Sequence, residues 1–316
     1  MEPFRIDVPD AVLDDLRDRL LRTRWPAEIK GVGWDRGTDP AYLRDLVAYW
    51  ADGFDWRAQE ARMNELPQFR ADGLHFVHQA GEGLPVLLLH GWPDSFLRYE
   101  KVLPLLAGRP VVVPSLPGYG FSDPPAEPGQ VTRSAMAARM ATLMESLGYD
   151  RYAVSGGDIG NGTAEALAGA HPDRVAGLHL TDLALWHLTG LDPTTLSGPE
   201  RDYLAAAAAW ARTDGAYLQL QATRQLTAAY GLTDSPAGLA GWIVEKLRAW
   251  SDGFPFSRDE VLTHVTLYWV TNTIGSSFGP YAERETVAPF DRVTVPAAVS
   301  QFAFDTLHAP REYAER

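Results

Sequence analysis

The hydrophobic residues of the N-terminal region recur at helical intervals. Apolar positions over residues 11–22, which follow the capping candidate Asp10, predict one helix, and residues 42–50 predict another. Four tryptophans make this region too apolar for a loose tail: Trp25, Trp34, Trp50 and Trp56. We therefore expect residues 1–66 to form a helical lead that packs against the core of the protein.

From residue 67 the pattern changes to short apolar runs that alternate with helical stretches. The runs predict strands over residues 74–79, 85–89, 110–114, 152–155 and 175–180. Helices are predicted between them, over residues 95–106, 133–147 and 160–170. Such alternation is typical of a mostly parallel sheet with helices on both faces. Residues 67–182 therefore predict the first part of an α/β core.

Between residues 183 and 288 the pattern becomes helical and rich in aromatic residues. This predicts a helical cap inserted into the core, although any one aromatic residue also fits an ordinary hydrophobic interior. The aromatic residues are Trp186, Trp210, Tyr217, Tyr230, Trp242, Trp250, Tyr268, Trp269 and Tyr281. A strand predicted over residues 295–304 returns the chain to the sheet, so residues 289–316 are expected to continue the core.

Charge and composition narrow the range of partners. The 316 residues carry a net charge of −13 with a pI near 5.0, which argues against nucleic acid and anionic membranes. The chain has no cysteine, which excludes disulfides and thiolate metal sites. It begins without the basic and apolar segments of a signal peptide, and no apolar stretch approaches the ~18–20 residues of a membrane helix. We expect a cytoplasmic protein without metal or cofactor, and the sequence leaves its oligomeric state open.

The most informative motif is Gly156-Gly157-Asp158-Ile159-Gly160. It lies where a predicted strand turns into a predicted helix, the position of the G-x-S-x-G nucleophile elbow of α/β-hydrolases. Aspartate replaces the serine, and its carboxylate is expected to be ionised at neutral pH without help from a base. Such a nucleophile suits displacement at a saturated carbon, as in an epoxide or an alkyl halide. By itself the motif also fits a turn in which the aspartate caps a helix.

A second motif, His90-Gly91-Trp92-Pro93, directly follows a predicted strand. In hydrolases of this layout a backbone N–H at the end of that strand points at the reaction centre. We therefore expect the N–H groups of Trp92 and Ile159 to form an oxyanion hole, which stabilises the charge of an acyl-type intermediate. For His90, a structural role in the turn is the favoured interpretation.

With these motifs in place, the chain resembles the microsomal-type epoxide hydrolase family, including its bacterial members. The resemblance runs from Pro3 to the last residue. It rests on ordered segments at residues 4–6, 22–26, 64–69, 90–93, 156–160, 234–240 and 304–310. It implies an α/β-hydrolase core with an N-terminal region and an inserted cap, and an enzyme that converts a hydrophobic epoxide to a vicinal diol.

The resemblance also implies roles for individual residues. Asp158 matches the family's nucleophile, and Tyr217 and Tyr281 match the two cap tyrosines that hydrogen-bond the epoxide oxygen. A phenol stays protonated at pH 7 and can donate to an opening oxide. Asp305 matches the acid that orients the catalytic histidine, where many relatives carry glutamate. The alternative for Asp305 is a cap of the next turn.

The catalytic histidine itself has no match in this chain. In the family it lies beyond the acid, after one more strand, whereas eleven residues follow Asp305 here. None of the eight histidines stands at the matching position. His308 belongs to a Leu-His-Ala-Pro pattern in which it is not the base, and His264 falls in the predicted cap. We therefore expect an epoxide to alkylate Asp158 and the resulting ester to hydrolyse slowly, because ester hydrolysis needs a base.

Two other functions stay open at this point. A haloalkane dehalogenase also uses an aspartate nucleophile, although the paired tyrosines and the N-terminal region favour the epoxide. A non-catalytic or single-turnover ligand-binding protein on a hydrolase fold would also lack the histidine. A truncated or incomplete chain explains the missing histidine better, because the loss of a strand and a helix would expose the edge of the sheet.

Overall fold

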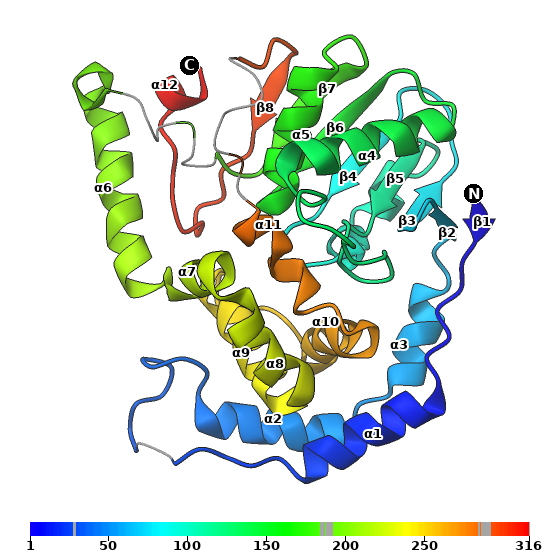
Figure 1. Cartoon of the computed structure of the whole chain (residues 1–316), viewed down its shortest axis with the longest axis vertical. Helices are drawn as coiled ribbons and strands as arrows, with labels where there is room; N and C mark the ends of the chain where they lie inside the picture. The colour runs from blue at the N-terminus through cyan, green and yellow to red at the C-terminus, as the bar shows by residue number, and fades with distance from the viewer. Residues whose placement is uncertain (28–29, 184–186, 188–191, 284, 286–291, 316) are drawn as a thin grey trace.

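A computed structural model describes residues 1–316 except 28–29, 184–186, 188–191, 284, 286–291 and 316. Within the described residues one sheet has the strand order β1-β2-β3-β5-β4-β6-β7-β8 (Figure 1). The strands are β1 (Glu2–Pro3), β2 (Gln68–Ala71), β3 (Leu74–Gln79), β4 (Val86–Leu89), β5 (Val111–Pro114), β6 (Tyr152–Gly156), β7 (Val175–Leu180) and β8 (Ala297–Val299). Strands β5, β4, β6, β7 and β8 run parallel, whereas β1, β2 and β3 pair antiparallel with their neighbours.

The predicted α/β core is confirmed, and the central strands show why the pattern was strong. Strands β4 and β5 consist almost wholly of valine and leucine and are almost completely buried, as expected for parallel strands covered on both faces. The carboxyl ends of β4, β6 and β7 meet at one edge of the sheet, where functional side chains gather in such folds. Strands β1 and β2 were not predicted.

Helices α4 (Arg133–Ser146) and α5 (Ile159–Ala170) lie together on one face of the sheet (Figure 1). The side chain of Thr132 accepts a hydrogen bond from the Ala135 N–H and caps α4. The helix predicted over residues 95–106 is wrong. That segment forms two short 3-10 turns, Phe96–Tyr99 and Leu103–Leu106, and Pro104 lacks the N–H that a continuous helix would need.

The cap lies beside the carboxyl end of the sheet, below it in Figure 1. Its helices are α6 (Gly198–Thr213), α7 (Ala216–Thr223), α8 (Gln225–Asp234), α9 (Pro236–Ala249), α10 (Arg258–Thr271) and α11 (Gly279–Ala282). Ser197 and Ser257 begin α6 and α10 with reciprocal capping bonds. The described part of residues 183–288 contains no strand, as predicted. Trp186 lies outside the described residues, and the division of the chain at residues 66, 182 and 288 stays a prediction.

The N-terminal lead contains α1 (Asp10–Leu21), α2 (Pro40–Asp52) and α3 (Trp56–Met63), of which α3 was not predicted. It contacts both the sheet and the cap. Strand β1 pairs with β2, and the Arg19 guanidinium forms an ion pair with Asp234 at 2.7 Å. The Thr38 hydroxyl donates to the Gly241 carbonyl of α9 at 2.6 Å, and the Arg248 guanidinium lies 4.5 Å from the centre of the Trp34 ring. The lead therefore packs on the cap as much as on the core.

The strand predicted over residues 295–304 is much shorter than expected. Strand β8 ends at Val299, because its partner β7 ends at Leu180 and offers nothing further to pair with. Phe302 and Phe304 are 59% and 65% exposed, so the apolar residues that suggested a strand belong to a surface loop. The chain then ends in a short helix, α12 (Arg311–Ala314).

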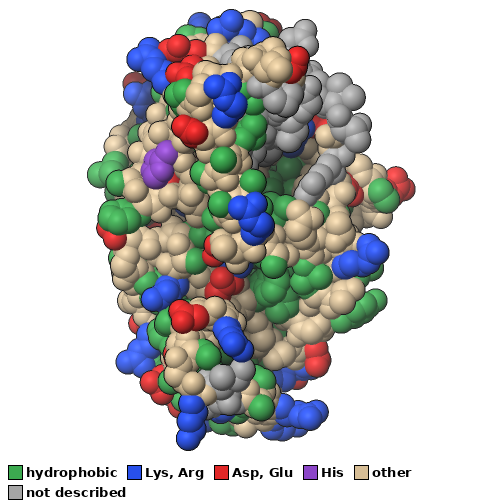
Figure 2. Space-filling view, turned by 90° about the vertical axis from the view of Figure 1, so that its left-hand side faces the viewer, with side chains coloured by type: hydrophobic (Ala, Val, Ile, Leu, Met, Phe, Trp, Pro, Cys, Tyr) green, Lys and Arg blue, Asp and Glu red, His purple; other side chains and the backbone are tan. Residues whose placement is uncertain are grey.

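Charged side chains of both signs are interspersed over the face of the molecule shown in Figure 2. Neither sign dominates that face. Among the described helices, none combines the length and the apolar character needed to cross a membrane.

Candidate active site

Asp158 lies at the turn between β6 and α5. Its φ of 53° and ψ of −121° place a non-glycine residue in a strained region of backbone space, as is common at functional sites. A Cβ on Gly160 would lie 2.3 Å from the Leu89 carbonyl oxygen, so α5 can approach β4 only with glycine at this position. The elbow predicted from the motif is therefore present.

Two backbone donors contact the Asp158 carboxylate. The Trp92 N–H donates to Asp158 Oδ1 at 2.7 Å, and the Ile159 N–H also hydrogen-bonds the carboxyl group. A Cβ on Gly91 would lie 2.5 Å from Asp158 Oδ1, so the loop after β4 reaches the carboxylate because Gly91 has no side chain. The structure thus brings Trp92 and Ile159, the residues expected to form the oxyanion hole, onto the same group.

His90 supports this loop from beneath. It is completely buried, with Nδ1 3.0 Å from the Gly91 carbonyl oxygen and Nε2 accepting from the Leu116 N–H at 3.0 Å. Burial lowers the pKa of His90 to about 4, so the ring is neutral near pH 7. These contacts fit the structural role favoured from the sequence.

Asp158 lines the cavity and keeps an exposed surface there. Loss of solvation raises the pKa of Asp158 to about 7, hydrogen bonds from Trp92 and Ile159 oppose the rise, and the charge of nearby Asp182 adds to it. The pKa of the nucleophile is therefore raised from that of an ordinary aspartate, the value on which the expectation of a carboxylate ionised at neutral pH rested. The motif could not reveal this, since Trp92 and Asp182, which also shift the pKa, lie outside it.

Tyr217 on α7 and Tyr281 on α11 meet beside Trp92. The two tyrosine ring centroids lie 6.2 Å apart, Tyr217 stacks on the indole at 5.3 Å, and Tyr281 meets that indole edge-on at 6.1 Å. Burial raises the pKa of both phenols and the negative charge on Asp158 raises it further, while a hydrogen bond with Tyr281 opposes the rise for Tyr217. Both phenols are thus kept in the protonated form near pH 7.

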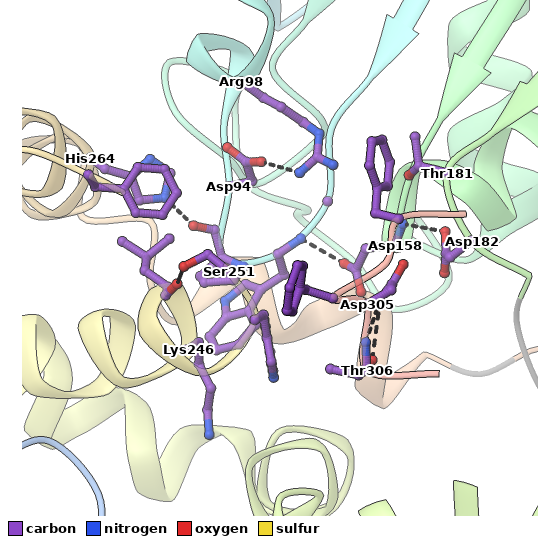
Figure 3. A pocket seen from close by; sticks show the side chains of 18 of the residues that line it. Asp94, Arg98, Asp158, Thr181, Asp182, Lys246, Ser251, His264, Asp305 and Thr306 are labelled. Carbon is purple, nitrogen blue, oxygen red and sulfur yellow. Dashed lines mark hydrogen bonds and ion pairs between the residues drawn. The ribbon is translucent and has the colours of Figure 1, made fainter. Parts of the chain in front are cut away.

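Asp182 and Asp305 are among the carboxyl groups that share the cavity with Asp158 (Figure 3). Asp305 lies on the loop after β8, and its Oδ1 accepts from the Thr306 N–H at 2.8 Å, the contact expected of a turn cap. Asp182 follows β7 directly, and its Oδ1 accepts from the Asp158 N–H at 3.2 Å. Burial raises the pKa of Asp182, and the charge on Asp305 adds to the rise. Sequence reasoning missed Asp182, although its place just past a predicted parallel strand was a usable signal.

The cavity has a volume of about 900 Å³. Aromatic side chains from the cap and from the loops after β4 and β8 form much of its wall: Trp92, Trp210, Tyr217, Trp250, Phe256, Phe302 and Phe304. Among the described residues of the wall, His264 is the one histidine, and its Nε2 contacts the Pro93 carbonyl oxygen. Within the described residues, no group of three or more histidine, aspartate or glutamate side chains is arranged to hold a metal ion.

Several charged residues of the wall were not anticipated from the sequence, among them Asp94, Arg98 and Lys246. Asp94 and Arg98 form an ion pair at 2.7 Å beside the elbow, and the Arg98 charge lowers the pKa of Asp158 slightly against the larger effect of burial. The i, i+4 spacing of Asp94 and Arg98 was the available signal. Lys246 on α9 lines the cavity from the cap side, and its sequence carried no signal of this position.

Comparison with known proteins identifies the family of this chain. Residues 1–99 match the model described as epoxide hydrolase N terminus, and residues 85–236 match that of the alpha/beta hydrolase fold. A Stigmatella aurantiaca protein provisionally named as an epoxide hydrolase is 39% identical to this chain, over 99% of this chain and 76% of its own length. The chain belongs to the microsomal-type epoxide hydrolase family.

Other members show how far the relationship extends. Epoxide hydrolase 1 of Sus scrofa is 31% identical, over 100% of this chain and 81% of its own length. The structure of an enantioselective mutant of the Aspergillus niger epoxide hydrolase superimposes with a TM-score of 0.87 at 30% identity, covering 99% of this chain and 86% of that one. The family and the α/β-hydrolase fold inferred from the sequence are thus confirmed. The named relatives are epoxide hydrolases, which confirms the expected enzyme class.

Proposed function

We propose that the chain opens a hydrophobic epoxide by forming an alkyl ester on Asp158. Trp92 holds Oδ1, so we assign the attack to Oδ2. A new bond forms between Oδ2 and an epoxide carbon, and the bond from that carbon to the epoxide oxygen breaks. The displaced oxide takes a proton from a tyrosine hydroxyl and becomes the alcohol of the ester product.

Tyr217 and Tyr281 are the donors assigned to the oxide. Their pKa values are raised by burial and by Asp158, which keeps the protons on the phenols until a stronger base, the opening oxide, lies between them. Their contact with Trp92 fixes both rings against the loop that also holds the nucleophile. Donor and nucleophile are thus positioned by one structural unit, as preorganised catalysis requires.

The ester is released as a diol by a second step that needs a water molecule and a base. Attack of water on the ester carbonyl would place negative charge on Oδ1, where the N–H groups of Trp92 and Ile159 stabilise it. We assign Asp305 to the acid that would orient such a base. His264 is the one histidine among the described residues of the cavity wall, and its Nε2 contacts the Pro93 carbonyl oxygen. We therefore propose that this second step is slow in the 316-residue chain.

The hydrogen bond from the Trp92 N–H to the Asp158 carboxylate at the elbow is the observation that carries this proposal. Incubation of the 316-residue protein with styrene oxide should add the substrate mass to the peptide that contains Asp158, as read by mass spectrometry. Diol should not exceed about one equivalent per protein. Asp158→Asn should abolish the adduct, while keeping an amide oxygen that accepts from Trp92. Absence of any adduct would refute the proposal, and sustained diol formation would refute its second half.

The same mass assay, together with a halide-release assay on alkyl halides, separates the alternatives. A haloalkane dehalogenase would release halide from alkyl halides over many turnovers and leave the epoxide untouched. A binding protein would hold the epoxide reversibly without a mass change. The aromatic wall and the volume of about 900 Å³ favour an aryl or otherwise bulky apolar epoxide as the substrate.

A further inference from the structure

Lys246 is a lysine whose charge is buried among aromatic rings. Its side chain is only 7% exposed. The Nζ atom lies 4.7 Å from the centre of the Tyr217 ring, and 5.8 Å and 6.0 Å from the rings of Trp250 and Trp242. Figure 3 shows the side chain running toward the cap helices and away from the Asp158 carboxylate.

Burying an ammonium group carries a large desolvation cost unless something compensates it. Two contacts do so here: the ring faces just described, and the Glu245 carboxylate, which lies 2.5 Å from Nζ. A leucine or methionine would fill the same space among three aromatic rings without that cost. The cation is therefore placed where an apolar residue would serve packing equally well, and the closest ring belongs to a tyrosine of the proposed site.

We propose that Lys246 is a positioning residue that strengthens Tyr217 as a hydrogen-bond donor to the opening epoxide, an inference that rests on the function proposed above. As the C–O bond breaks, negative charge builds on the oxide and is shared with the phenol oxygen through the hydrogen bond. A cation over the ring face stabilises that charge. Asp158 acts in the opposite direction on the same phenol, because a carboxylate nearby disfavours negative charge on it.

The test uses two reagents that alkylate Asp158 differently. An aryl epoxide needs a proton for its oxide, whereas an alkyl bromide with the same aryl group releases bromide, which needs none. Lys246→Met keeps the stem of the side chain and removes the charge. We expect it to slow the maximal rate of Asp158 alkylation by styrene oxide by about 2- to 30-fold, the range that a cation–π contact of this kind supports. Alkylation by 2-phenylethyl bromide should keep its rate.

Matched variants sharpen the result. Lys30→Met makes the same substitution at an exposed lysine and should change neither rate. Lys246→Arg retains a cation and should restore most of the epoxide rate. Glu245→Gln removes the anion that partly cancels the charge of Lys246, so it should leave the epoxide rate unchanged or raise it. A rate that falls in Lys246→Met but does not fall in Glu245→Gln would not arise from a general loss of stability.

A double-mutant cycle decides whether Lys246 acts through Tyr217. In a Tyr217→Phe background, Lys246→Met should have no further effect on the epoxide rate. Equal loss with both reagents in Lys246→Met would show a merely structural role and overturn the inference. So would an undiminished epoxide rate in that variant, or full additivity in the cycle. Failure of the wild-type protein to be alkylated by any epoxide would instead refute the proposed function, so the two failures are distinguishable.

Discussion

Replacement of Asp158 by asparagine should make the folded protein more stable. The carboxyl group has a pKa near 3.8 in the unfolded chain and about 7 in the folded protein, chiefly because folding removes its solvation. The folded state therefore keeps the proton up to a higher pH than the unfolded chain does. Ionised Asp158 costs stability progressively as the pH rises from about 4 to about 7, and the cost is constant above that.

The size of the effect follows from that difference. The pKa difference between 3.8 and about 7 corresponds to a change in the free energy of unfolding of ~4 kcal/mol at pH 8, and to less than half of that at pH 5. Water in the cavity screens a carboxylate that it can reach, so we expect a measured gain of about 1–2 kcal/mol at pH 8 for Asp158→Asn. The asparagine amide oxygen still accepts from the Trp92 N–H, so the substitution removes the charge and keeps the hydrogen bond.

Urea unfolding at pH 8 and at pH 5 measures both values in one series. Asp252→Asn makes the same change at an exposed carboxylate of the cavity wall and should shift the free energy of unfolding by less than about 0.5 kcal/mol. A stability gain that is the same at both pH values would show that desolvation of the carboxylate is not its cause. A loss of stability at pH 8 would show that Asp158 is better solvated or better paired than the geometry indicates.

Three further outcomes are expected. The rate of Asp158 alkylation by an epoxide should fall about tenfold per pH unit below pH 7, because only the ionised carboxylate attacks; a flat profile down to pH 5 would contradict the raised pKa. Tyr217→Phe and Tyr281→Phe should each slow that alkylation by about 10²-fold, as measured by mass spectrometry of samples quenched over time. Equal slowing with an alkyl bromide would argue against a donor role. Gly91→Ala should abolish alkylation, because its Cβ would meet Asp158 at 2.5 Å, whereas Gly231→Ala, with open space around it, should remain active.

The sequence predicted the parts of this protein that depend on local pattern. Runs of valine and leucine in β4 and β5 revealed the sheet because a strand buried on both faces has to be apolar throughout. The glycines around Asp158 revealed the elbow because no other residue permits the close approach of α5 to β4. The roles of the cap tyrosines came from the family resemblance, since nothing in their spacing sets them apart from the other cap aromatics.

Features that depend on distant contacts could not be predicted. The pKa of Asp158 depends on burial and on the charges of Asp182 and Arg98, which lie outside the motif. The burial of Lys246 is visible only once α9 packs beside Tyr217. The strand predicted near the end of the chain failed for a similar reason. Residues 295–304 contain an apolar run, but the pairing of β8 with β7 extends only to Val299, opposite Leu180 at the end of β7.

The N-terminal lead has a consequence for how substrate enters. One end of the lead is a strand of the sheet, and its helices hold the cap through Arg19 and Thr38. Because these contacts tie the cap to the sheet, we expect it not to swing outward as a free lid. Phe302 and Phe304 line the cavity and are largely exposed, so we expect substrate and product to pass beside their loop. Exchange would then depend on that loop, while the lead would hold the two tyrosines at a fixed position relative to the nucleophile.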